Sequence, residues 1–169
     1  RESELLARLR HDHLVPVFEA GMADGVPWFA MELVDGCSLA DVLRHLRARH
    51  GAPCDGEALA QALAAALGDP AGGARLRASS HTAAVVQCLL PIGSALACAH
   101  DQHILHRDVK PANIRLRRDG VPLLGDFGLA RDERDPALTQ VGSFAGTPFY
   151  VSPEQAAGLP VDQRCDIYS

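Results

Sequence analysis

The first part of the chain changes from helical to strand-like spacing of its hydrophobic residues, and then back. In RESELLARLRHDH, Leu5, Leu6 and Leu9 recur at helical spacing, which predicts the end of an amphipathic helix. LVPVFEAGMADGVPWFAMELV predicts two strands around a Gly/Asp turn, which is a β-hairpin. SLADVLRHLRARHG predicts a second helix, with Ser38 as N-cap and Asp41 in the first turn.

The rest of the chain mixes one long helix with short strands. From about residue 48 to 81 the sequence is rich in Ala, Gly and Pro, which predicts an inserted short helix with loops, and we favour a surface excursion over a binding role. TAAVVQCLLPIGSALACAH predicts a long apolar helix kinked at Pro91. Short strands are predicted around ILHRD, NIRLRRDG and VPLLGDFG, followed by a polar loop to about Gly146.

Composition narrows the function classes. The chain has 169 residues, 47% of them hydrophobic, which suits one domain or part of one. A net charge of −5 argues against nucleic-acid binding. Five widely spaced cysteines without a C-x-x-C pair predict neither a disulfide framework nor a zinc site, and favour a reducing compartment. We take ALAQALAAALG as the longest apolar stretch, well short of the roughly 20 residues that a membrane helix needs, so no membrane contact is expected from this segment.

HRDVKPAN concentrates the candidate chemistry. The chain has fifteen arginines and a single lysine, Lys110, which stands two residues after Asp108. Phosphoryl transfer from ATP needs a carboxylate to orient the attacking hydroxyl, a cation near the moving phosphoryl group and oxygen ligands for Mg²⁺. Asp108 can be the base, Lys110 the cation and Asn113 a metal ligand, while Asp126, thirteen residues further on, supplies a second metal ligand.

Four motifs in register resemble a protein kinase. HRDVKPAN, DFGLAR, GTPFYVSPEQ and DIYS look like the catalytic loop, the magnesium loop, the P+1 loop with its Pro-Glu anchor, and the start of the following helix. Lys110 and Thr147 resemble the Ser/Thr branch, and the whole is similar to the eukaryotic-like Ser/Thr kinases of bacteria. The resemblance implies a truncated α+β, protein-kinase-like bilobal fold, from the family's C helix to the start of its F helix. Residues 1–34 would be the N-lobe remnant and hinge, and 35–169 part of the C-lobe with an insertion at about 48–81.

The resemblance also implies roles for individual residues. Glu2 would pair with a lysine that lies outside these residues, and Leu6, Val17, His106 and Phe127 would stack as a spine. Asp166 would hold the backbone of HRD. The adenosine of ATP would meet Met31 as gatekeeper, the backbone of Glu32 and Val34, and Asp41 near the ribose. Arg115 stands where the family usually places an apolar residue under the adenine. The other implied structural positions are Gly128, Thr147 (a partner of Asp108 and Lys110) and Glu154.

Arg107, directly before Asp108, implies a kinase that is switched on by a phosphate on the activation loop. Thr139 is the first candidate acceptor and Ser143 the second. The alternative for Thr139 is a solvated loop hydroxyl. Arg131 and Arg134 are further candidates to bind this phosphate, although loop arginines are usually solvated.

The leading hypothesis is a Ser/Thr protein kinase that uses ATP and Mg²⁺, with Mn²⁺ as an alternative ion, on protein substrates in the cytoplasm. A membrane anchor elsewhere in the intact protein remains open. The sequence holds no Gly-rich phosphate loop and no second lysine, so we expect the segment alone to be unstable and inactive. The alternatives are a pseudokinase or truncated scaffold that binds proteins without catalysis, and a small-molecule kinase of the aminoglycoside type.

Overall fold

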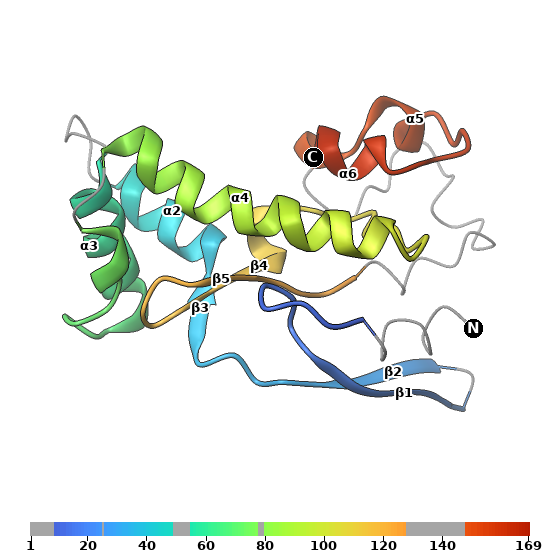
Figure 1. Ribbon diagram of the computed structural model, residues 1–169, viewed down its shortest axis with the longest axis horizontal. Coiled ribbons are helices and arrows are strands. Elements are labelled where there is room, and N and C mark those ends of the chain that lie inside the picture. The colour runs from blue at the N-terminus through green and yellow to red at the C-terminus, as the bar shows by residue number, and fades with distance from the viewer. Residues whose placement is uncertain (1–8, 25, 49–54, 78–79, 128–147) are drawn as a thin grey trace.

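The computed structural model describes residues 9–24, 26–48, 55–77, 80–127 and 148–169. The helix predicted at the start of the chain lies largely outside these residues, as does the polar loop that precedes Gly146. The described chain forms a β-hairpin, a small three-stranded sheet and a set of helices packed around one long helix (Figure 1).

The predicted hairpin is present and projects from the rest of the chain. Strand β1 (Val17–Ala23) pairs antiparallel with β2 (Val26–Met31), and the register shifts between Val17 and Glu19. Figure 1 shows the hairpin along one edge of the molecule, away from the helices. Several of its large apolar side chains are exposed, namely Phe18, Met22 and Val26.

The second sheet has the order β3-β4-β5 and is antiparallel throughout. Its strands are β3 (Gly36–Ser38), β4 (Ile114–Arg117) and β5 (Pro122–Leu124). The strands predicted in NIRLRRDG and VPLLGDFG are therefore confirmed. The strand predicted around ILHRD is wrong, because this segment is an irregular loop whose backbone N–H groups at His106 and Arg107 bond to a side chain instead of a neighbouring strand.

Helix α2 (Leu39–Arg47) begins as the sequence predicts. The hydroxyl of Ser38 accepts a hydrogen bond from the N–H of Asp41, and the Asp41 carboxylate accepts one from the N–H of Ser38, which completes a capping box. This cap fixes where the chain turns from β3 into the helix.

Helix α4 (His81–His100) is the long helix of the molecule. It continues through Pro91 as one element of 20 residues, and the kink expected at Pro91 stays a prediction. By length and composition α4 is apolar enough to cross a membrane, so the sequence estimate that no stretch reaches that length is wrong. Its buried residues nevertheless belong to the protein core: Ala84, Cys88, Ile92, Ala95, Leu96 and Ala99.

The described residues of the inserted segment (residues 48–81) contribute to the core, so the expectation of a surface excursion is wrong. The segment contains α3 (Gly56–Leu67), capped by Asp55, and a 3₁₀ turn, η1 (Ala74–Leu76). Leu59, Leu63 and Leu76 are buried in one cluster with α2, α4 and β4. The prediction failed because the small residues of α3, such as Ala60, allow close packing that an alanine-rich pattern does not reveal.

Two short helices lie at the end of α4 that is remote from α3 (Figure 1). They are α5 (Pro153–Ala156), which the buried Ser152 caps, and α6 (Arg164–Tyr168). Two further 3₁₀ turns are η2 (Pro111–Asn113) and η4 (Pro148–Tyr150). The four cysteines in the described part of the chain are free thiols: Cys37, Cys88, Cys98 and Cys165.

Candidate active site

Three side chains of HRDVKPAN meet at the carboxylate of Asp108. The Lys110 Nζ atom lies 2.7 Å from Asp108 Oδ2 and donates to it. The Asn113 amide nitrogen donates to the same oxygen at 3.0 Å and to the Asp108 carbonyl at 2.8 Å. The side chains of Asp108 and Lys110 keep 24% and 29% of their surface exposed, so both can reach a ligand from solvent.

Asp126 is brought to this cluster by the end of β5. The Gly125 N–H donates to the carbonyl of Asn113 at 3.0 Å, which places Asp126 beside the turn that carries Asn113. Asp126 is exposed and has a φ of 56°, in the left-handed region that is uncommon for a residue with a side chain. Asn113, the last residue of η2, directly precedes β4, and Asp126 follows β5 by two residues, so the pairing of Ile114 with Leu124 brings both to the same end of the two strands.

The loop that carries Asp108 has an unusual backbone. His103 has a φ of 59° and Arg107 a φ of 64°, so two residues with side chains occupy the left-handed region within five positions. Such conformations cost energy and persist where the surroundings hold them, which is common at functional sites. His103 takes the conformation that a glycine would adopt easily, and histidine tolerates it better than most residues.

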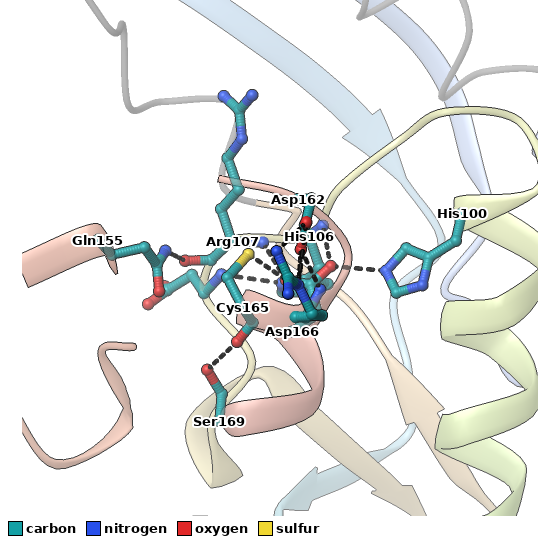
Figure 2. Close-up of polar contacts among 10 residues, drawn as sticks. His100, His106, Arg107, Gln155, Asp162, Cys165, Asp166 and Ser169 are labelled. Carbon is teal, nitrogen blue, oxygen red and sulfur yellow. Dashed lines mark hydrogen bonds and ion pairs between the residues drawn. The ribbon is translucent and has the colours of Figure 1, made fainter. Parts of the chain in front are cut away.

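A buried carboxylate holds this backbone in place. Asp166 Oδ2 accepts from the N–H of His106 at 2.8 Å, and Oδ1 accepts from the N–H of Arg107 at 2.6 Å. His100 Nε2, at the end of α4, donates to Asp166 Oδ2 at 2.8 Å. Figure 2 shows Asp166 between His100 and the backbone of the two loop residues. The contact with the backbone is the one that the resemblance implied for Asp166, whereas His100 was not singled out from the sequence.

His106 is fully buried under the site and neutral. Its Nε2 donates to the carbonyl of Gly125 at 2.9 Å, and its Nδ1 accepts from the N–H of Asp108 at 3.3 Å. Burial lowers the pKa of His106, against smaller opposing effects of the Gly125 bond and nearby carboxylates. Its ring lies 4.6 Å from that of Phe127, centroid to centroid. His106 thereby ties the loop before Asp108 to the end of β5.

The segment after the site adds a contact that sequence reasoning missed. Gln155 Nε2 donates to the carbonyl of Arg107 at 2.9 Å, while its Oε1 accepts from the N–H of Ser152 as part of the α5 cap. Both backbone polar groups of Arg107 are therefore bonded to residues far along the chain (Figure 2). A capping pattern, S-P-E-Q, was the only available signal, and it predicts a helix start rather than this bond.

The residues expected around adenosine lie near the linker between β2 and β3. Met31 ends β2 and is partly exposed, and Val34 is buried against Val15 and Leu123. The N–H of Glu32 donates to Pro16 at 2.9 Å, so only the carbonyl of Glu32 can serve a base there.

Two other residues expected near the nucleotide have structural contacts. Asp41 accepts bonds from Ser38 and Arg44, so its carboxylate serves the start of α2. The hydrogen bond from the Ser38 hydroxyl is the main cause that lowers the pKa of Asp41. Arg115 lies on β4 and its Nη2 donates to the carbonyl of Gly36 at 3.3 Å.

Several predicted residues lie outside the described part of the chain. These are Glu2, Leu6, Gly128, Arg131, Arg134, Thr139, Ser143 and Thr147. Val17 and Glu154 are described and both are partly buried, Val17 at the start of β1 and Glu154 in α5.

The residues present suit Mg²⁺. Asn113 uses its amide nitrogen on Asp108, which leaves the amide oxygen as the group to offer a cation, and Asp126 adds a carboxylate. Mg²⁺ is typically held by one or two carboxylates together with substrate phosphates. Among the described residues there is no cluster of three or more His, Cys, Asp or Glu side chains that could hold a metal without such a substrate.

Known proteins are similar to this chain in sequence and in fold. The family model described as the protein kinase domain matches residues 1–169. This chain belongs to the protein kinase family. It is 36% identical over 175 residues to a probable serine/threonine-protein kinase PknB of Corynebacterium glutamicum, covering 100% of this chain and 22% of that protein. It is 35% identical over 173 residues to the serine/threonine-protein kinase PknJ of Mycobacterium tuberculosis, covering 100% of this chain and 24% of that protein.

A solved kinase domain supports the same fold. The crystal structure of the Mycobacterium tuberculosis PknI kinase domain is similar with a TM-score of 0.63 and 31% identity, over 98% of this chain and 50% of that chain. The resemblance to bacterial Ser/Thr kinases and the truncated kinase fold are therefore confirmed. The chain spans roughly a quarter or less of the curated relatives it matches and half of this solved kinase domain.

Proposed function

We propose that the intact protein transfers the γ-phosphoryl group of ATP to serine or threonine hydroxyls of other proteins. The observation that carries the proposal is the Asp108 carboxylate, partly exposed, with the amine of Lys110 at 2.7 Å and the amide of Asn113 at 3.0 Å. Membership of the protein kinase family and similarity to named Ser/Thr kinases support the same activity.

Asp108 would orient the attacking hydroxyl and accept its proton. Its carbonyl and one carboxylate oxygen are held by Asn113, which fixes the direction of the group without burying it. Lys110 would offset the charge of the transferred phosphoryl group, since its amine lies on the same carboxylate and can turn toward a phosphate oxygen. Positioning and charge neutralisation are the main contributions that this reaction asks of a protein.

Asn113 and Asp126 would hold Mg²⁺ together with the phosphates of ATP. The bound ion would neutralise charge on the phosphate oxygens. The backbone bond from Gly125 to Asn113 keeps the two ligand residues in register, so a shift of β5 relative to β4 would separate them.

The linker between β2 and β3 would bind the adenine through the backbone of Glu32 and Val34, beside Met31. Arg115 would lie beneath the base with its guanidinium directed to Gly36, so its aliphatic stem can supply the apolar surface. Asp41 is occupied at the cap of α2, and any contact with the ribose would compete with that cap.

Arg107 would couple the site to a phosphate on Thr139, with Ser143 as the second candidate acceptor. The support is indirect: the backbone of Arg107 is fixed on both sides by Asp166 and Gln155, so its side chain starts from a rigid point. A phosphate that pairs with an arginine can order a loop through charge-assisted hydrogen bonds.

Transfer of labelled phosphate from ATP to a generic protein substrate tests the proposal. Asp108→Asn in the intact protein should lower kcat by at least about 100-fold, because the base is lost while the shape is kept. Asp101→Asn is the matched control: Asp101 is exposed at the end of α4, seven residues before Asp108, and this variant should keep wild-type activity.

Two outcomes would contradict the proposal. Undiminished transfer by Asp108→Asn would remove Asp108 from the mechanism. A wild-type protein that binds Mg-ATP but transfers no phosphate would favour the scaffold hypothesis instead.

A further inference from the structure

Three arginines from β4 and the turn after it contact the linker between β2 and β3 (residues 32–35) or the first residue of β3, Gly36. Arg115 donates to the carbonyl of Gly36, and Arg117 Nη2 lies 3.5 Å from Glu32 Oε1. Arg118 makes the shortest of these contacts, with its Nε 2.9 Å from Asp35 Oδ2. The linker is the segment whose backbone would bind adenine, and these contacts join β4 and the turn after it to the linker carboxylates at Glu32 and Asp35 and to the carbonyl of Gly36.

Arg118 also contacts the inserted segment. Its Nη1 lies 2.6 Å from Asp69 Oδ2, just beyond the end of α3. The other oxygen of Asp69 accepts from the N–H of Ala71 at 3.0 Å, so the carboxylate is held in place. One guanidinium thus joins two carboxylates that are 34 positions apart, one in the linker and one in the insertion.

The inserted segment fixes the backbone of Arg118 as well. The N–H of Gly73 donates to the carbonyl of Arg118 at 2.8 Å. Gly73 has a φ of 74°, and a Cβ there would lie 2.9 Å from the Cα of Ala60 in the buried part of α3. A Cβ on Gly120 would lie 3.2 Å from the buried Leu76. Because this packing is tight, the place of Arg118 depends on the described part of the inserted segment that holds Ala60, Gly73 and Leu76.

We propose that Arg118 is a positioning residue through which the inserted segment (residues 48–81) sets the linker that holds the adenine of ATP. This inference rests on the proposed function. The planar fork of an arginine can serve Asp35 and Asp69 at once, which the compact amine of a lysine does less well. Without the guanidinium of Arg118 the linker has more conformational freedom, and ATP binding must then order it. The residues around Asp108 are untouched, so affinity for ATP changes while the chemical step does not.

The alternative is that these are ordinary surface ion pairs. Exposed pairs often contribute little, and half of the Arg118 side chain is exposed. The two explanations differ in their consequences for Asp69, which lies in the insertion and has no expected contact with ATP. Only a bridge through Arg118 makes ATP affinity depend on Asp69.

The test uses the intact protein and measures both the Kd of a fluorescent ATP analogue with Mg²⁺ and the steady-state kcat and KM for ATP. Arg118→Ala and Asp69→Asn should each raise Kd and KM by about two- to five-fold with kcat unchanged. Asparagine keeps an oxygen for the Ala71 bond, so the end of α3 stays intact. In the Arg118→Ala background, Asp69→Asn should have no further effect. Arg118→Lys should restore part of the affinity.

The matched control is Arg77→Ala. Arg77 pairs with Glu57 at 3.1 Å and with the carbonyl of Pro70, both within the inserted segment, so this variant should bind ATP as the wild type does. Salt gives an independent readout: KCl should weaken ATP binding more steeply in the wild type than in Arg118→Ala, because screening removes the same ion pairs.

Two results would overturn the inference, and they differ from failure of the proposed function. If Arg118→Ala and Asp69→Asn bind ATP as Arg77→Ala does, or if their effects simply add, Arg118 does not connect the two segments. A wild-type protein that neither binds Mg-ATP nor transfers phosphate would contradict the proposed function, and the inference with it.

Discussion

At the scale of single residues, the buried carboxylate of Asp166 maintains the loop that carries Asp108. It accepts hydrogen bonds from two consecutive backbone N–H groups and from His100. One of these N–H groups belongs to Arg107, which has a left-handed backbone conformation and directly precedes Asp108. The arrangement of the catalytic loop therefore depends on a residue 58 positions away that takes no part in the chemistry.

Asp166→Asn should destabilise the intact kinase domain by about 2–4 kcal/mol, because an amide can accept at one oxygen only and leaves a buried N–H unpaired. The urea dependence of unfolding measures this effect. Asp162→Asn is the control, since Asp162 is exposed and pairs with its neighbour Arg164, and no measurable change is expected. Equal stability of the two variants would show that Asp166 does not hold the loop.

The neutral state of His106 predicts a pH dependence. Burial lowers the pKa of His106 in the folded protein, whereas in the unfolded chain it titrates near its usual value of about 6.5. As the pH falls below that value, the unfolded chain binds a proton that the folded protein resists, so the stability contribution is full above it and is lost on acidification.

The urea midpoint of the wild type should therefore fall more between pH 7.5 and pH 5.5 than that of His106→Gln, which has no group to titrate at this position. All other histidines are shared by the two proteins, so their effects cancel in the comparison. Parallel loss of stability in both would contradict a buried neutral His106.

At the scale of elements, Asp41 at the start of α2 has two candidate roles, one as part of the helix cap and one as a contact of the ribose. Its carboxylate completes the capping box with Ser38, although the kinase resemblance implies a contact near the ribose. Asp41→Ala should lower the free energy of unfolding by about 1 kcal/mol and leave the KM for ATP nearly unchanged.

Ser38→Ala is the companion variant, because it removes the same cap from the other side, and the two substitutions together should cost little more than one. A large rise in KM for ATP with unchanged stability of Asp41→Ala would favour the ribose contact.

The packing of the inserted segment can be measured at two glycines with similar backbones. Gly68 and Gly73 have φ angles of 63° and 74°, but a Cβ on Gly68 meets nothing within 4 Å, whereas one on Gly73 meets the backbone of Ala60. Gly68→Ala should cost about 1 kcal/mol for the backbone alone. Gly73→Ala should cost about 1–3 kcal/mol more, because α3 must shift. Equal costs in urea unfolding would show that the segment is loosely attached.

At the scale of the whole molecule, the sequence correctly predicted the elements and motifs that are determined by residues close together in the chain. The hairpin, the capped start of α2, the long helix α4 and the chemical motifs all follow from spacings within about 20 residues. The meeting of Asp108, Lys110 and Asn113 could also be predicted, since all three lie in one eight-residue motif.

The sequence-based predictions that were wrong concern features that depend on contacts between distant segments. ILHRD has the composition of a strand, yet Asp166 takes its backbone N–H groups. The alanine-rich insertion resembled a surface excursion, but its buried residues belong to one core cluster with residues of α2, α4 and β4. His100, Gln155 and Arg118 acquire their roles from partners 48 to 83 positions away, and nothing in the local sequence marks them.

The most direct test of the proposed kinase activity is to incubate the intact protein with Mg-ATP and a generic protein substrate, and to identify every phosphorylated side chain by mass spectrometry. The proposed function predicts phosphate on serine and threonine side chains of the substrate and, within this chain, on Thr139 in preference to Ser143. No transferred phosphate, or phosphate on tyrosine alone, would contradict the assignment of Asp108, Lys110, Asn113 and Asp126 to a Ser/Thr protein kinase site.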